Sequence, residues 1–289
     1  MQNIKRHLKG GCLALMALAL SPLTALETQA QYQLTQFPWG FPSGINNGGT
    51  IVVNGAFDPE TFEEGPALVD GDSVTLISIP NAFFPNLGGI NAQGTVVGSA
   101  YTEDFSSSFG FVRTKDGQVT VLNIPGAAAI NPSGINSRVV VVGLVFDENF
   151  SSHSFIWDAT GPKLFDAPDA DSTELTGINA SGSAVGNYTI GGISHPFTLS
   201  GSRFTPLNIP GASSSFASGI NSRGQIVGSY SSPAHTNLAG LFMIAAQSPR
   251  LIFPFRKSGR LRAFLRGHSI GVTLGAALSP TFGPSNSRL

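Results

Sequence analysis

Histidine and carboxylate side chains are the groups in this chain that could bind a metal ion or move a proton. His153 and His195 stand at equivalent places, each two residues before a phenylalanine. A metal site needs several such ligands at one point, whereas equivalent positions in successive copies of a repeat lie apart around an axis. We therefore expect both histidines to be structural, each hydrogen-bonded at the start of a strand.

Acidic residues gather in short segments, and calcium sites use such segments because hard cations prefer oxygen ligands. The weak calcium candidates are Asp169, Asp171 and Glu174, which precede a Gly-Ile-Asn sequence. The D-x-[DN]-x-[DN]-G pattern of a calcium loop does not accompany them. We expect these residues to be solvated carboxylates, and the sequence predicts no metal ion or other cofactor.

Hydrolysis of a glycosidic bond is another possible chemistry, and it needs two carboxyl groups that face each other. Among the segments that lead into Gly-Ile-Asn, only the one before Gly177 contains an acidic residue, Glu174. One carboxyl group cannot serve as both acid and nucleophile. The chain also lacks a G-x-S-x-G sequence, and its only cysteine, Cys12, lies near the N-terminus. The sequence therefore predicts no catalytic residues.

These residues lie in a chain of sequence repeats. The tripeptide Gly-Ile-Asn occurs five times, at intervals of 45, 45, 43 and 42 residues. In four copies another glycine follows nine residues after the first. Asparagine beside glycine is typical of tight turns. We interpret the recurring asparagines as turn formers, the alternative being a ring of amides that binds a sugar or peptide. They are Asn46, Asn91, Asn136, Asn179 and Asn221.

The second copy indicates the content of one repeat. A segment that ends in Gly-Ile-Asn is followed by predicted strands over residues 95–101, 109–114 and 119–124. Four antiparallel strands in about 43 residues is the size of a propeller blade. The sequence predicts an all-β fold, a β-propeller of about five four-stranded blades, with a β-solenoid as the alternative.

One turn departs from the pattern. The turn glycine of the other copies is Val139 in the third copy. A β-branched residue strongly disfavours a positive φ. We therefore expect this turn to adopt another geometry.

Closure of the ring has two possible solutions. Residues 31–38 resemble a fourth strand without its first three, and the last copy has three strands that end near residue 246. We expect the N-terminal strand to complete the last blade, because this closure hides two sheet edges at once. Residues 249–254 are the alternative fourth strand.

The two ends of the chain differ from the repeats. Residues 1–30 combine early basic residues, an apolar run over 12–20 and small residues near position 30, which predicts a signal peptide and export. Residues 31–254 form the predicted propeller, and residues 255–289 a basic, flexible tail or a short amphipathic helix. A buried N-terminal helix is the alternative for the first segment.

Charge is divided unevenly along the chain. Residues 31–249 contain six Lys or Arg and sixteen Asp or Glu, a net charge of −10, whereas residues 250–289 contain seven Lys or Arg and no acid. An acidic body repels phosphates, so we expect no nucleic-acid partner for the repeats. We also expect no membrane span.

The repeats resemble the HAF repeat family of bacterial extracellular proteins. The sequences GINAQGTVVG from Gly89, GINASGSAVG from Gly177 and GINSRGQIVG from Gly219 fit its G-I-N-x-x-G-x-x-V-G pattern, and His153-Ser154-Phe155 and His195-Pro196-Phe197 are similar to its His-Ala-Phe tripeptide. The resemblance implies a secreted propeller-like protein and no catalytic residue. We expect a non-catalytic extracellular binding or scaffold module for a glycan or protein. The alternative is a secreted hydrolase that acts on polysaccharide.

Overall fold

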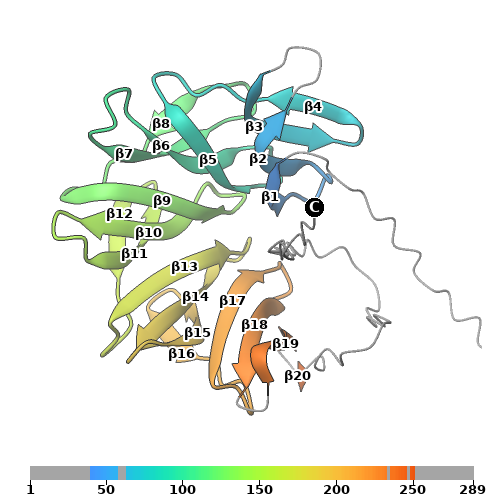
Figure 1. Cartoon of the computed structure of the whole chain (residues 1–289), viewed down its shortest axis with the longest axis vertical. Helices are drawn as coiled ribbons and strands as arrows, with labels where there is room; N and C mark the ends of the chain where they lie inside the picture. Colours follow the sequence, from blue (N-terminus) through green and yellow to red (C-terminus); the bar gives the residue numbers. More distant parts are fainter. Residues whose placement is uncertain (1–39, 58–62, 233–234, 246–247, 251–289) are drawn as a thin grey trace, which may run out of the picture. The chain divides into compact units, whose positions relative to one another are not determined.

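The computed structural model describes residues 40–57, 63–232, 235–245 and 248–250, all within the compact unit Pro38–Leu289. These residues form five four-stranded sheets, and in each sheet the strands follow one another in chain order (Figure 1). All neighbouring strands are antiparallel. The prediction of an all-β fold built from four-stranded blades is confirmed.

Blade 1 contains β1 (Phe41–Ile45), β2 (Ile51–Phe57), β3 (Glu64–Asp70) and β4 (Ser73–Leu76). Blade 2 contains β5 (Phe83–Ile90), β6 (Val96–Tyr101), β7 (Ser108–Arg113) and β8 (Val119–Val121). Blade 3 contains β9 (Ala127–Ile135), β10 (Val141–Asp147), β11 (Ser152–Asp158) and β12 (Gly161–Phe165). Blade 4 contains β13 (Ser172–Ile178), β14 (Ser183–Ile190), β15 (Ile193–Ser200) and β16 (Arg203–Pro206). Blade 5 contains β17 (Ser214–Ile220), β18 (Ile226–Ser232), β19 (His235–Ala245) and β20 (Ser248–Arg250).

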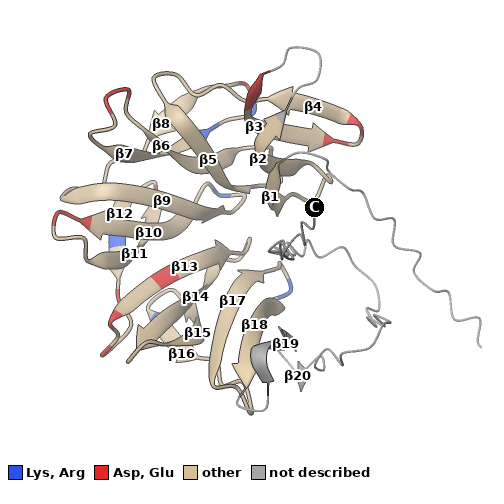
Figure 2. Ribbon diagram, in the orientation of Figure 1, with Lys and Arg blue, Asp and Glu red and all other residues tan. Residues whose placement is uncertain are grey.

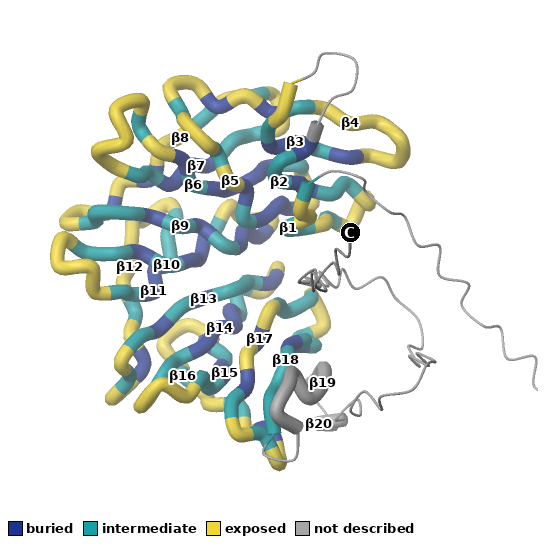
Figure 3. Tube along the Cα trace, viewed as in Figure 1, coloured by how far each residue is buried: buried dark blue, intermediate teal, exposed yellow. Residues whose placement is uncertain are grey.

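The core lies between neighbouring blades and along the middle of their strands (Figure 3). Phe111, Phe155 and Phe197, one from the third strand of three successive blades, are fully buried. Phe155 packs in one cluster with Val97 and Leu122 of blade 2. Burial of one such phenyl ring contributes about 1.5–3 kcal/mol. A blade therefore has no complete core of its own and is stabilised by its neighbour.

A β-bulge recurs where the first strand of each blade approaches Gly-Ile-Asn. The register with the second strand shifts at the residue before the glycine in all five blades. In blade 3 the bulge places Gly143 opposite Pro132. A Cβ atom on Gly143 would lie 2.2 Å from the carbonyl oxygen of Asn131, so only glycine fits there. The glycine that follows nine residues after the motif is thus a packing requirement.

The glycine of Gly-Ile-Asn lets neighbouring blades approach closely in the middle copies. A Cβ atom on Gly134 would lie 3.2 Å from the Cα atom of Gly177, and one on Gly89 would lie 3.4 Å from the Cα atom of Gly134. The first strands β5, β9, β13 and β17 lie side by side in this order (Figure 1). At the motif their backbones touch without intervening side chains.

The asparagines of Gly-Ile-Asn form a ladder that crosses from blade to blade. The Oδ1 atom of Asn91 accepts hydrogen bonds from the backbone N–H groups of Gln93 and Thr95, both at 3.0 Å. Its Nδ2 atom donates to the carbonyl of Asn136 at 3.1 Å. Asn136 and Asn179 repeat the same contact to the next blade, at 3.1 and 3.2 Å. One side chain therefore both caps a turn and joins two blades. The hydrogen bonds of its amide group go to backbone atoms.

The turn of the third copy corrects our expectation. Val139 keeps the left-handed geometry of the glycines, with a φ of 59° against 81° for Gly94. Its N–H group donates to the carbonyl of Asn136 at 3.0 Å, as that of Gly94 does to Asn91. The expectation of another geometry was wrong, because the bonds made by Asn136 on either side of Val139 fix the backbone.

The fourth strand of the last blade is also a correction. Strand β20 pairs with β19, with Pro249 opposite Ile244, and so fills the place that we assigned to the N-terminal strand. The alternative assignment, a strand that includes Pro249, is the one observed. Residues 31–38, the predicted signal peptide 1–30 and the predicted tail 255–289 lie outside the described residues. In the part of the chain that is described, no helix is long and apolar enough to span a membrane.

Candidate functional site

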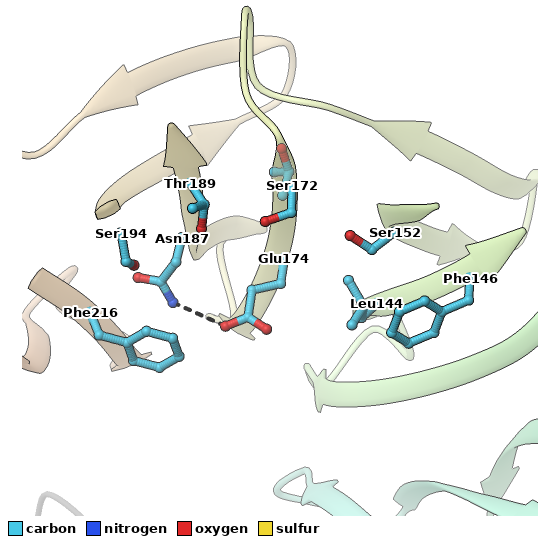
Figure 4. Close-up of a pocket in the computed structure, with 10 residues that line it drawn as sticks. Leu144, Phe146, Ser152, Ser172, Glu174, Asn187, Thr189, Ser194 and Phe216 are labelled. Atoms are coloured by element: carbon cyan, nitrogen blue, oxygen red, sulfur yellow. Dashed lines mark hydrogen bonds between the residues drawn. The ribbon is translucent and has the colours of Figure 1, made fainter. Parts of the chain in front are cut away.

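A pocket of about 280 Å³ opens between blades 3, 4 and 5, at the strand ends away from the Gly-Ile-Asn turns (Figure 4). Its residues flank the β10–β11 and β14–β15 connections and the beginnings of β13 and β17. They are Leu144, Phe146, Ser152, Ser172, Thr173, Glu174, Asn187, Thr189, Ser194 and Phe216. This size suits one small ligand group.

An asparagine bridge between blades 4 and 5 lies beside the pocket. Asn187 of β14 donates from Nδ2 to the carbonyl of Ala217 at 3.1 Å, and Oδ1 accepts from the N–H group of Ala217 at 2.7 Å. Asn54 of blade 1 makes the same pair of bonds with Leu87 of blade 2. The equivalent residue of blade 3 is Leu144, which has no amide group. The pocket lies on the blade 4 side of this leucine.

Glu174 is the ionisable group of the pocket. It lies on β13 opposite Asn187, and the Nδ2 atom of Asn187 is 3.4 Å from Oε1 of the carboxyl group. Burial raises the pKa of Glu174 above its usual range, and the hydrogen bond from Asn187 opposes this shift. Within the described ranges, the carboxylate has no ion pair with Lys, Arg or His.

The pocket wall combines apolar and hydroxyl side chains. Figure 4 shows Glu174 between Phe216 on one side and Leu144 and Phe146 on the other. Serine and threonine hydroxyls complete the wall, and the buried Oγ atom of Ser194 has no hydrogen-bond partner among the described residues. Such a wall can hold a ligand that has both an apolar face and several polar groups.

The structure does not bring the calcium candidates together. The carboxylate of Asp171 accepts a hydrogen bond from the N–H group of Gly191 at 2.7 Å, and Asp169 lies in the preceding loop with a φ of 57°. Glu174 is in the strand and lines the pocket. Acidic residues lie mainly in connections and also on β13 (Figure 2). No three His, Cys, Asp or Glu residues gather as a metal site in the described part.

The two histidines make separate contacts in separate blades. The Nδ1 atom of His153 lies 2.8 Å from Oδ2 of Asp166, and its Nε2 atom lies 3.8 Å from Oδ2 of Asp147. The hydrogen bond to Asp166 is the main cause that raises the pKa of His153. His195 stacks on Tyr188, with 5.2 Å between the ring centres. Neither histidine lines the pocket.

Sequence reasoning singled out Glu174 but missed its surroundings. Asn187, Ser194 and Phe216 carry no motif, and Phe216 stands 42 positions from Glu174. The sequence did contain one signal for the bridge between blades. Asn54 and Asn187 occupy the same place in their repeats, one residue after the second-strand residue that pairs beside the bulge. The same place holds Ser99 in the second copy and Leu144 in the third, and neither residue has an amide group.

Comparisons with known proteins address the fold. No protein-family model matches the sequence, and no curated protein is similar enough to count as a relative. The chain is similar to the structure of a putative TolB from Agrobacterium tumefaciens, with a TM-score of 0.56 and 11% identity over 75% of this chain and 80% of that one.

Two further solved structures have a weaker similarity to the chain. Virginiamycin B lyase from Staphylococcus aureus has a TM-score of 0.41 and 19% identity over 68% of this chain and 65% of that one. The β-propeller domain of the Trilobed protease from Pyrococcus furiosus has a TM-score of 0.39 and 9% identity over 75% of this chain and 85% of that one. Of these three structures, only the putative TolB, with its TM-score of 0.56, supports a shared fold, and its identity of 11% supports nothing beyond the fold. With its five four-stranded antiparallel blades, this chain has the architecture of a β-propeller.

Proposed function

We propose that this chain is a secreted, non-catalytic binding module of the HAF repeat type, and that the pocket at Glu174 receives one sugar unit of an extracellular glycan. The observation that carries this proposal is the composition of the pocket wall, which combines one half-buried carboxyl group with hydroxyls and two phenyl rings.

A sugar unit matches this wall group by group. Its hydroxyls can donate to the carboxylate of Glu174 and exchange hydrogen bonds with the hydroxyls of Ser172 and Thr189. Its C–H face is apolar and can pack on Phe146 or Phe216, which supply large contact area. The volume of about 280 Å³ accommodates a single unit and leaves the rest of a glycan chain outside.

The same wall supports a role without turnover. Glycoside hydrolysis needs two carboxyl groups about 5–10 Å apart across the bond that is cleaved. Among the described residues that line the pocket, Glu174 is the only acid. Export is supported by the signal-peptide features of residues 1–30, and the HAF resemblance of the repeats agrees with an extracellular location.

The test is a glycan-array screen of the full chain, followed by calorimetry with the best ligand. Phe216→Ala is expected to weaken binding at least tenfold, because it removes one apolar wall of the pocket. The matched control is Phe150→Ala, which truncates a ring that is 81% exposed on the β10–β11 connection and outside the pocket. The proposal fails if no glycan binds or if both variants lose the same affinity. Release of cleaved product would favour the polysaccharide hydrolase instead.

A further inference from the structure

We propose that the sugar unit recognised in this pocket carries a free amino group, whose ammonium pairs with the carboxylate of Glu174. This inference rests on the proposed function and names the class of sugar, an amino sugar without an N-acetyl group.

A buried or half-buried carboxylate is normally paired with a cation or satisfied by several hydrogen-bond donors. In the described part of the chain, Glu174 has one such donor, the Nδ2 atom of Asn187, at the long distance of 3.4 Å. The residue opposite Glu174 on the neighbouring strand is Asn187, and no basic residue of the described part forms an ion pair with the carboxylate. The carboxylate therefore faces the pocket with most of its acceptor capacity unused.

Asn187 cannot turn to supply what is missing. Both ends of its amide are held by the backbone of Ala217, at 2.7 and 3.1 Å. Rotation of the amide toward Glu174 would break the bridge between blades 4 and 5. The strongest available partner for the carboxylate is consequently a ligand group that brings its own positive charge.

The rest of the wall favours an ammonium on a sugar over one on a peptide. Phe216 and Phe146 line the pocket on either side of Glu174, and the face of a phenyl ring attracts a cation. Ser152, Ser172 and Thr189, which carry hydroxyl groups, also line the space. A lysine side chain has no hydroxyl groups for these positions, whereas an amino sugar has several.

The experiment compares deacetylated chito-oligosaccharides with their fully N-acetylated counterparts by calorimetry on the full chain, at a mildly acidic pH at which the sugar amines are protonated. The wild-type protein is expected to bind the amine form at least tenfold more tightly, as one charge-assisted hydrogen bond provides. Glu174→Gln is expected to abolish the preference. Glu148→Gln is the matched control, because it removes the same charge from an exposed residue of the β10–β11 connection.

The outcomes separate the two proposals. Equal affinity of the wild-type protein for both forms overturns the amine inference and leaves glycan binding intact, and this measurement needs no variant. Binding of neither form, with no other glycan bound, overturns both. An equal loss of preference in Glu148→Gln shows attraction by the acidic surface in general and overturns the role of Glu174. Tighter binding of a lysine-rich peptide would overturn the assignment to a sugar. Melting temperatures of both variants check that they fold.

Discussion

Replacement of Val139 by glycine is expected to stabilise this protein, although the removal of a β-branched side chain usually destabilises a folded protein. Val139 has a φ of 59°, in the left-handed region that costs a residue with a Cβ atom about 1–2 kcal/mol. The same position is glycine in the other four copies, with φ between 73° and 90°. The strained valine is held by the hydrogen bonds that Asn136 makes with its two neighbours.

The size of the effect follows from three contributions. Relief of the left-handed strain favours the variant by about 1–2 kcal/mol, and the greater freedom of glycine in the unfolded chain opposes it by about 0.5–1 kcal/mol. Little burial is lost, since the Val139 side chain is 39% exposed and belongs to none of the core clusters. We expect a net gain of about 1 kcal/mol, which raises Tm by roughly 2–4 °C.

Urea denaturation measures the gain as a higher midpoint with an unchanged slope. The reciprocal variant is Gly49→Val, at a φ of 88° with no atom within 4 Å of the added Cβ, and it should lose about 1–2 kcal/mol from the backbone alone. Val139→Ala keeps the Cβ atom and should recover little. A lower midpoint for Val139→Gly, or equal gains for Ala and Gly, would refute the reasoning.

Three more outcomes are expected. Asn91→Ala removes two turn-capping bonds and one bond between blades from a buried residue, so unfolding should become easier by about 2–4 kcal/mol; an unchanged urea midpoint would contradict the ladder. Gly143→Ala should lower the free energy of unfolding by about 3 kcal/mol or more, because the added Cβ would overlap the Asn131 carbonyl oxygen. Gly65→Ala is the control, since its Cβ meets open space and stability should change little. Calorimetry of both variants measures the difference. Asp166 raises the pKa of His153, so this pair stabilises the fold fully below about pH 6.5. Its contribution is lost as pH rises through the raised pKa of the folded state. The Tm difference between wild type and His153→Asn should therefore shrink toward alkaline pH, and a difference that grows would count against the pair.

The sequence predicts the blades well because each blade repeats the same local rules. The Asn91 turn and the alternation of strands and turns depend on residues a few positions apart. The resulting four-stranded sheets are those observed. Two predictions were wrong because they depended on more than local preferences. The preference of Val139 for a negative φ was outweighed by the hydrogen bonds of Asn136. The strand that completes the last blade could not be chosen from local sequence, because two segments matched a fourth strand equally well and β20 is the one that pairs with β19.

The candidate site belongs to the tertiary structure. Glu174 was visible from its sequence position, but its neighbours Asn187 and Phe216 reach it only through the pairing of β13 with β14 and the packing of β17 beside them. Contacts between blades join residues 30 to 45 positions apart, such as Asn187 with Ala217 and Asn91 with Asn136. The sequence by itself determined the repeat, its turns and its strands, because backbone preferences are local. Only the tertiary structure decided where an asparagine joins two blades and which residues line the pocket, because those contacts depend on how successive blades meet.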